Sequence, residues 1–135
     1  MRYITGIHAL NLPCDLLTDG DWHCSALRWE RITVRDTEHS FFKDYGIEHG
    51  KRIPEHEKTY AVANHIRALL DLLEMGRFSV AQGMNRDFIG NNEYNEEIFE
   101  KVASMRVLPH WLDIDRFMGR EYYSKWLDYK RRMKL

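Results

Sequence analysis

The spacing of apolar residues changes near residue 53, from patterns typical of strands to the spacing of helices. Tyr3 to Leu12 mixes β-branched and aromatic residues and is followed by a proline, which cannot donate a hydrogen bond to a sheet. Arg31 to Asp36 alternates polar and apolar residues, as a strand with one buried face does. We therefore predict strands at both segments, and we expect Ser40 to Ile47 to pair with the second strand as a hairpin.

After Pro54, apolar residues recur at the spacing of one helix face. The stripe consists of Val62, Ala63, Ile66, Leu69, Leu70 and Leu73. Pro54 suits the first turn of a helix, and Gly76 can adopt the left-handed conformation that ends one. These signals predict a core helix from Glu55 to Met75. His65 lies beside the stripe, where we expect a hydrogen-bonded residue at the border of the core rather than a metal ligand.

Two more helices are predicted towards the end of the chain. Asn95 can cap a helix that runs to Met105, and Pro109 separates this helix from a short turn at residues 111–119. Residues 120–132 are expected to form a terminal helix. Three aromatic residues share one face of it, namely Tyr122, Trp126 and Tyr129.

Length and composition favour one folded domain. A chain of 135 residues, of which 44% are hydrophobic, can bury a core without help from a second domain. We expect a single domain over residues 1–135, with a β-rich part at 1–50 and a helical part at 54–133. The predicted fold class is α+β, in which a small N-terminal antiparallel β part packs against three or four C-terminal helices.

Charge and residue usage narrow the classes of partner. The chain has 20 Lys and Arg residues against 21 acidic residues. This balance argues against nucleic acid as the partner, because proteins that bind nucleic acid usually carry an excess of basic residues. No apolar run approaches the roughly eighteen residues of a membrane span, and the first residues lack the apolar segment of a secretory signal. We therefore expect a cytoplasmic protein without membrane contact.

Cys14 and Cys24 match neither a zinc motif nor a disulfide framework, so reduced thiols, no cofactor and no metal are predicted.

The densest group of chemically active residue types lies between Thr18 and Glu30. If Asp21 caps a short helix, Trp22 and Trp29 fall on one face of it, and we predict that both indoles are buried. The alternative is a metal site or a Cys–His nucleophilic pair. Its residues would converge if the first strand lies beside this turn, and they are His8, Cys14, Asp21, His23 and Cys24. The residue types leave both interpretations open.

Motifs that identify a reaction are absent from the sequence, which contains no phosphate-binding glycine loop and no GxSxG or HExxH pattern. We therefore predict a protein-interaction or regulatory module, such as an adaptor, an immunity protein or an antitoxin-like inhibitor, whose partner is a protein. Docking is expected on the terminal helix at Tyr123, Lys130 and Arg131. The alternative is a small enzyme, for example a metal-dependent or acid/base hydrolase or transferase. Its pocket would be formed by His8, Asp21 and His23. No pattern in the sequence fixes the oligomeric state.

Overall fold

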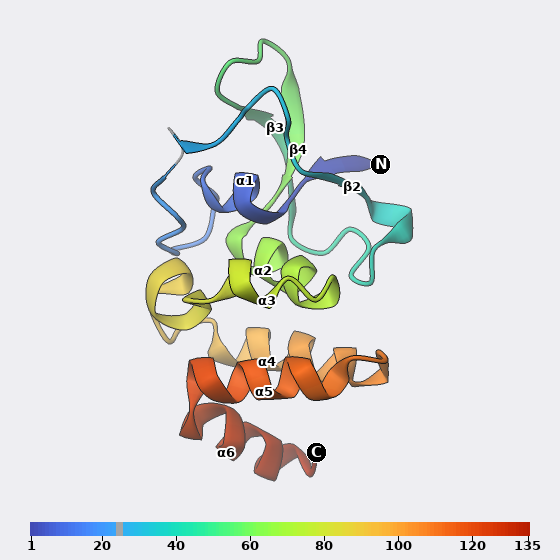
Figure 1. The fold of residues 1–135 in the computed structure, drawn as a ribbon, viewed down its shortest axis with the longest axis vertical. Helices are drawn as coiled ribbons and strands as arrows, with labels where there is room; N and C mark the ends of the chain where they lie inside the picture. The colour runs from blue at the N-terminus through green and yellow to red at the C-terminus, as the bar shows by residue number, and fades with distance from the viewer. Residues whose placement is uncertain (24–25) are drawn as a thin grey trace.

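The computed structural model describes residues 1–23 and 26–135, which form a four-stranded sheet followed by a helical half (Figure 1). The first half contains β1 (Arg2–Ile4), α1 (Gly6–Leu10), β2 (Val34–Asp36), a 3₁₀ turn (Thr37–His39), β3 (Ile47–Arg52) and β4 (Thr59–Ala63). The second contains α2 (His65–Glu74), α3 (Phe78–Ala81), a π-helical turn (Met84–Ile89), α4 (Asn95–Ser104), a 3₁₀ turn (Met105–Val107), α5 (Trp111–Tyr122) and α6 (Ser124–Met133). The predicted α+β class is confirmed.

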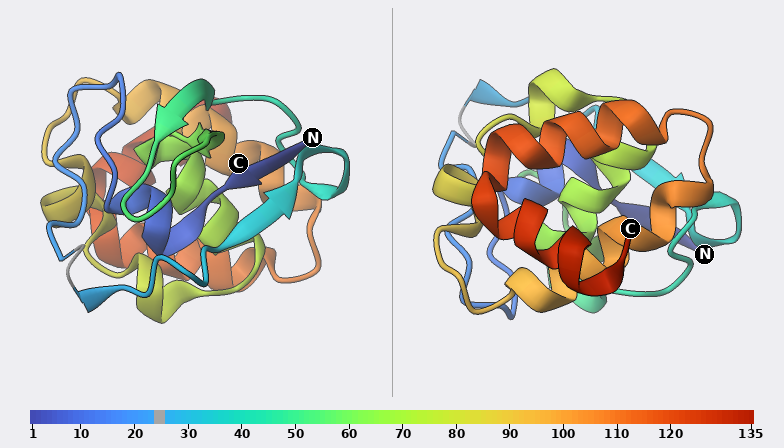
Figure 2. Two further views of the ribbon diagram at one scale, coloured as in Figure 1. Left: turned by 90° about the horizontal axis from the view of Figure 1, so that it is seen from above. Right: turned by 90° about the horizontal axis from the view of Figure 1, so that it is seen from below.

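The sheet consists of two antiparallel ribbons that meet along one short contact. The strand order is β2-β1-β4-β3, with β1 antiparallel to β2 and β3 antiparallel to β4. The two ribbons join where Ile4 of β1 pairs with Val62 of β4 in a parallel sense. The sheet is therefore mixed rather than wholly antiparallel, and the ribbons fan apart from this pair (Figure 2, left).

Helix α2 lies between the sheet and the C-terminal helices (Figure 1) and contacts α1, α3 and α4. Its first turn is capped by Asn64, whose side chain accepts a hydrogen bond from the Arg67 backbone N–H at 2.8 Å. Every residue from His65 to Leu73 is buried. Four apolar residues of the predicted stripe are 0% exposed, which confirms this part of the prediction: Ile66, Leu69, Leu70 and Leu73.

A buried ion pair on α2 ties the segment after β2 to the helix. Arg67 and Asp71 are both 0% exposed, and Arg67 Nε donates to Asp71 Oδ1 at 2.9 Å. The other N–H groups of Arg67 donate to the hydroxyls of Tyr3 and Ser40 and to the carbonyl oxygens of Lys43 and Tyr45. Because all five donors of the guanidinium are used within the chain, this group stabilises the fold and has no donor left for a ligand.

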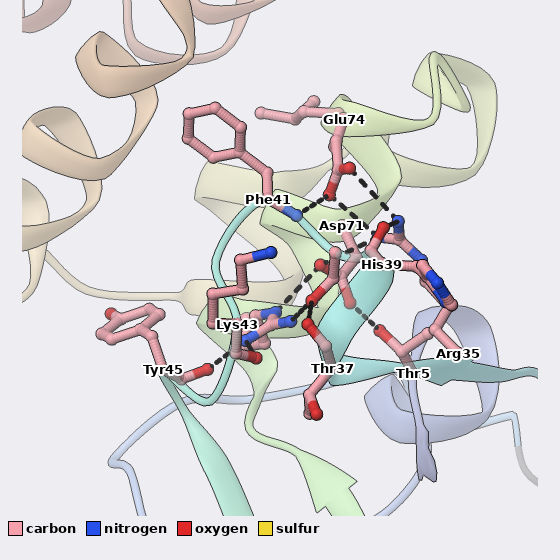
Figure 3. Close-up of polar contacts among 12 residues, drawn as sticks. Thr5, Arg35, Thr37, His39, Phe41, Lys43, Tyr45, Asp71 and Glu74 are labelled. Carbon is pink, nitrogen blue, oxygen red and sulfur yellow. Dashed lines mark hydrogen bonds and ion pairs between the residues drawn. The ribbon is translucent and has the colours of Figure 1, made fainter. Parts of the chain in front are cut away.

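Both carboxylate oxygens of Asp71 are likewise bound by groups of the same chain. Its Oδ2 accepts hydrogen bonds from the hydroxyls of Tyr3 and Thr5 at 2.6 and 2.7 Å. Burial, followed by the hydrogen bond to Asp71, raises the pKa of Tyr3 to about 12, so its hydroxyl stays protonated at neutral pH and donates to the carboxylate. Arg35 approaches Asp71 Oδ1 at 3.3 Å and also binds both oxygens of Glu74, at 2.9 and 3.2 Å (Figure 3).

The aromatic face predicted for the terminal helix is confirmed, although two helices contribute to it. Tyr122 of α5 and Trp126 and Tyr129 of α6 are 2%, 0% and 4% exposed. Their rings surround Phe99 of α4, with centroids 5.0 to 5.5 Å from its own. Tyr123 has a φ of 51° and divides the two helices, which join at an angle (Figure 2, right).

The first predicted strand, Tyr3–Leu12, is wrong beyond Ile4. Gly6 has a φ of 63°, in the left-handed region that favours glycine, and the chain turns there into α1. The predicted hairpin strand at Ser40–Ile47 is also wrong up to Gly46, where the described chain forms turns. The cause is the buried Arg67, which binds carbonyl oxygens of this segment and so holds it against α2 rather than beside β2.

The core helix begins at His65, and its predicted start at Glu55 is wrong. Glu55 has a φ of 68°, which is incompatible with a helix interior. Residues 59–63 form β4, so Val62 and Ala63 are buried as strand residues instead of helix residues. The side chain of Asn64, rather than Pro54, marks the start of the helix.

The short turn predicted at residues 111–119 is wrong as well, because these residues belong to α5. Ile114, Phe117 and Met118 have helical spacing and are 0%, 3% and 0% exposed, so the segment buries one apolar face as a helix. None of the helices within residues 1–23 and 26–135 is long and apolar enough to cross a bilayer.

Candidate functional site

The segment Asn11–His23, which we call the Trp22 loop, follows α1 and lies against the first turn of α2. The hydrogen bonds that hold its backbone include Asp21 N–H to Leu10 O at 2.8 Å, Gly20 N–H to Phe88 O at 2.8 Å, and Asn91 Nδ2 to Leu17 O at 2.6 Å. The loop is therefore fixed both to α1 and to the segment around the π-helical turn.

Gly20 allows the loop to approach α2 closely. Its φ is 72°, and a Cβ atom there would lie 2.7 Å from Cε1 of His65 and 2.8 Å from the carbonyl oxygen of Leu10. Both the backbone angle and the lack of space favour glycine at this position. The loop backbone thus rests directly on the imidazole ring of His65.

Trp22 is exposed, which contradicts its predicted burial, whereas the predicted burial of Trp29 is confirmed. The exposed fractions are 81% for Trp22 and 3% for Trp29, and Leu17 of the same loop is 72% exposed. The α-helix predicted after Asp21 is absent from residues 21–23 and 26–30, and positions 24 and 25 lie outside the described residues. Without that helix the two indoles share no face. Trp29 packs edge-on against the ring of His8, at 5.0 Å between centroids.

The surface around Trp22 carries more negative than positive groups. An open hollow of about 430 Å³ lies between the loop and the π-helical turn. Besides Trp22, it is lined by Asp19, Gly20, Asp21, His23, Arg86, Asp87 and Phe88. Three carboxylates stand there against one guanidinium, so the hollow beside the exposed indole is acidic.

A chain of three polar side chains connects the loop to α2. Cys14 Sγ lies 3.5 Å from Thr18 Oγ1, which lies 2.7 Å from Nδ1 of His65. The other ring nitrogen of His65, Nε2, is 2.7 Å from the carbonyl oxygen of Leu12. A carbonyl oxygen only accepts, so Nε2 carries a hydrogen, and Nδ1 of the neutral ring accepts one from the Thr18 hydroxyl. These side chains border a pocket of about 90 Å³, which Trp22 also lines.

The thiol and the imidazole at the two ends of this chain favour each other's charged form. Burial raises the pKa of the Cys14 thiol, but the neighbouring His65 and Thr18 outweigh burial and leave the pKa below its ordinary value. Burial lowers the pKa of His65, yet the neighbouring Cys14 thiol and the hydrogen bond to the Leu12 carbonyl raise it overall. The predicted hydrogen-bonded character of His65 is confirmed.

The residues predicted for an enzyme pocket make different contacts. Asp21 and His23 are hydrogen-bonded to each other at the surface. His8 is 6% exposed, and its ring nitrogens lie 3.1 Å from Thr33 Oγ1 and 3.0 Å from the Arg28 carbonyl oxygen. A catalytic role for the three stays a prediction. Among residues 1–23 and 26–135, no three His, Cys, Asp or Glu side chains are arranged to hold a metal ion.

The residues predicted to dock a partner lie along α6 and the turn before it. Tyr123 is 68% exposed, and Arg131 lies at the surface 3.4 Å from Asp128 of its own helix. Lys130 donates to Asp115 of α5 at 2.8 Å and lies over the Trp126 ring, so it holds α6 on α5. The docking role of this surface stays a prediction.

The predicted sites do not include Thr18 or His65, which are 47 positions apart and meet only in the fold. The local signal nearest to them is Gly20, a glycine between two aspartates that marks a tight loop. No family model, curated protein or solved structure matches this chain. Its function has to be argued from the geometry of the Trp22 loop and of the side chains beneath it.

Proposed function

We propose that this chain is a protein-interaction module, which docks by inserting Trp22 into an apolar socket of a partner protein. The main support is the 81% exposure of a tryptophan on a backbone that is already fixed. Burying a large apolar side chain contributes roughly 1.5 to 3 kcal/mol, and tryptophan is among the commonest anchors of protein interfaces.

The order of the loop supports the same role. Gly20 and Asp21 both donate backbone hydrogen bonds to residues outside the loop, and the carbonyl of Leu17 accepts one from Asn91. A loop that is ordered before binding loses little conformational entropy when a partner arrives. Most of the free energy gained by burying Trp22 and Leu17 in a partner can therefore contribute to affinity.

Charge around Trp22 indicates the chemistry of the partner. Asp19 and Asp87 are exposed beside the indole, and Arg86 is the one guanidinium that lines the hollow. Complementary charge raises the association rate and selects partners. We therefore expect a socket that is apolar at its centre and bordered by lysine or arginine.

This proposal keeps the interaction class and changes the docking surface. Lys130, predicted to face a partner, binds Asp115 within the chain, whereas Trp22 is 81% exposed. An adaptor, an immunity protein and an antitoxin-like inhibitor all remain compatible with this proposal, because each acts by binding a partner protein. The half-buried thiol of Cys14 supports a reducing compartment such as the cytoplasm.

The proposal predicts that Trp22→Ala weakens the complex strongly. A partner captured on the immobilised chain is identified, purified and titrated by calorimetry. Loss of an anchor tryptophan costs about 2 kcal/mol or more, so we expect Kd to rise about 30-fold or more. We also expect Asp87→Lys to slow association at low salt, because it reverses one charge of the acidic border.

Tyr123→Ala is the matched control, because Tyr123 is another exposed aromatic residue, 68% exposed, on a different surface. We expect it to leave Kd unchanged. If Trp22→Ala has no effect on Kd while Tyr123→Ala or the pair Lys130→Glu and Arg131→Glu weakens binding, docking belongs to the terminal helix and the Trp22 proposal is wrong.

A further inference from the structure

We propose that Cys14 is a nucleophilic thiol, which exchanges with small, positively charged disulfides and takes up half of the disulfide as a mixed disulfide. The site is the pocket of about 90 Å³ beside the Trp22 loop. The Cys14 side chain is half-buried and borders this pocket, so a small reagent can reach it while the fold restricts a large one. This proposal is independent of docking, because the modification is measured on the isolated chain.

The hydrogen-bond chain behind Cys14 supplies a route for its proton. His65 donates from Nε2 to the Leu12 carbonyl, which orients the ring and leaves Nδ1 to accept from Thr18. The Thr18 hydroxyl in turn accepts from the thiol at 3.5 Å. A nucleophile, a base and a group that orients the base form the arrangement that activates nucleophiles in proteins. In this chain a hydroxyl lies between the first two.

The exchange begins with proton transfer along this hydrogen-bond chain. Thr18 passes its proton to Nδ1 of His65 and receives the proton of the Cys14 thiol. The thiolate attacks one sulfur of the disulfide, a new sulfur–sulfur bond forms to Cys14, and the original bond breaks. The leaving thiolate takes a proton back from His65, directly or through Thr18. Cys14 is thereby oxidised, one sulfur of the reagent is reduced to a thiol, and excess thiol reverses the reaction.

The lining of the pocket selects the charge of the reagent. Asp19 and Asp21 line it together with Cys14, Thr18 and His65, and neither lysine nor arginine is among the lining residues. From β3, Glu48 also acts on His65 through its charge. A reagent with a cationic end is therefore attracted to the pocket, and an anionic reagent is repelled.

The experiment uses Cys24→Ser as the background, so that Cys14 is the only cysteine in the chain. The probes are cystamine, which is cationic, 2-hydroxyethyl disulfide, which is neutral, and 3,3′-dithiodipropionate, which is anionic. The rate of adduct formation at Cys14 is followed by intact-protein mass spectrometry across a range of pH. The same protein in urea gives the reactivity of an ordinary thiol in this sequence.

In the folded protein at pH 7 we expect cystamine to react about threefold or more faster than in urea, because the folded site favours the thiolate. The order of rates should be cationic, neutral, then anionic at low salt. Thr18→Val should slow the reaction, and Thr18→Ser, which restores the hydroxyl, should keep it fast. His65→Gln provides a second variant without the base, and it should also slow the reaction.

Three outcomes would overturn the proposal. A folded protein that reacts no faster than the denatured one excludes an activated thiol. Equal rates for the three disulfides exclude selection by Asp19 and Asp21. A folded Thr18→Val variant with an unchanged rate and an unchanged pH profile excludes the proton route through the hydroxyl.

Discussion

Arg67→Met is expected to lower the free energy of unfolding by about 3 to 5 kcal/mol, the range for removing one partner of a buried ion pair. The methionine side chain fills much of the space but donates no hydrogen bond. The Asp71 carboxylate, which is 0% exposed, would lose its closest cationic partner, and two carbonyl oxygens after β2 would lose their donor. Urea unfolding followed by far-UV circular dichroism measures the change.

Arg131→Met is the matched control for this substitution. Arg131 is exposed, and its contact is a 3.4 Å pair with Asp128 on the same helix, so we expect a change within about 0.5 kcal/mol. A loss below about 1 kcal/mol for Arg67→Met would contradict a stabilising role for the network, because removing one partner of a buried ion pair normally costs more.

The predictable part of the fold is the part determined by spacing along the chain. The spacing of Ile66, Leu69 and Leu70 places them on one face of a helix whatever surrounds that helix, and the structure buries all three. The same holds for Trp126 and Tyr129, which lie three apart on α6 and are both buried. Local periodicity is enough in both cases, because side chains three or four apart lie on the same side of a helix.

The errors occur where a distant segment decides the local structure. Thr59–Ala63 adjoins a strongly helical sequence, but it forms a strand because its neighbours in the sheet are β1 and β3. Its single pair with β1 joins Val62 to Ile4, and no spacing within the sequence reports that contact. Strand formation depends on pairing more than on intrinsic preference, so single-sequence patterns assign such segments poorly.

The candidate site was predictable only as a region. Thr18 and Trp22 lie within Thr18–Glu30, the stretch with the densest set of reactive residue types, and Cys14 lies four positions before it. Composition therefore indicated the region of the loop. The roles of its members depend on contacts over long separations. His65 reaches the loop through Thr18, 47 positions away, and Trp22 directly follows Gly20 and Asp21, whose backbone N–H groups donate to Phe88 and Leu10.

Trp29→Ala and Trp22→Ala are expected to differ in cost by about 3 kcal/mol, although the sequence predicts the same environment for both indoles. Trp29 is 3% exposed and packs on His8, so its removal leaves a cavity in the core and costs about 3 to 5 kcal/mol. Trp22 is 81% exposed, so its removal changes stability by about 0.5 kcal/mol or less. Both variants lose a fluorophore, so far-UV circular dichroism in urea is the suitable measurement.

Equal losses would mean that the two indoles share the core in solution, as a helix from Asp21 to Glu30 requires. A neutral Trp22→Ala would instead show that the indole contributes nothing to folding, and any loss of partner binding in that variant then belongs to the interface itself.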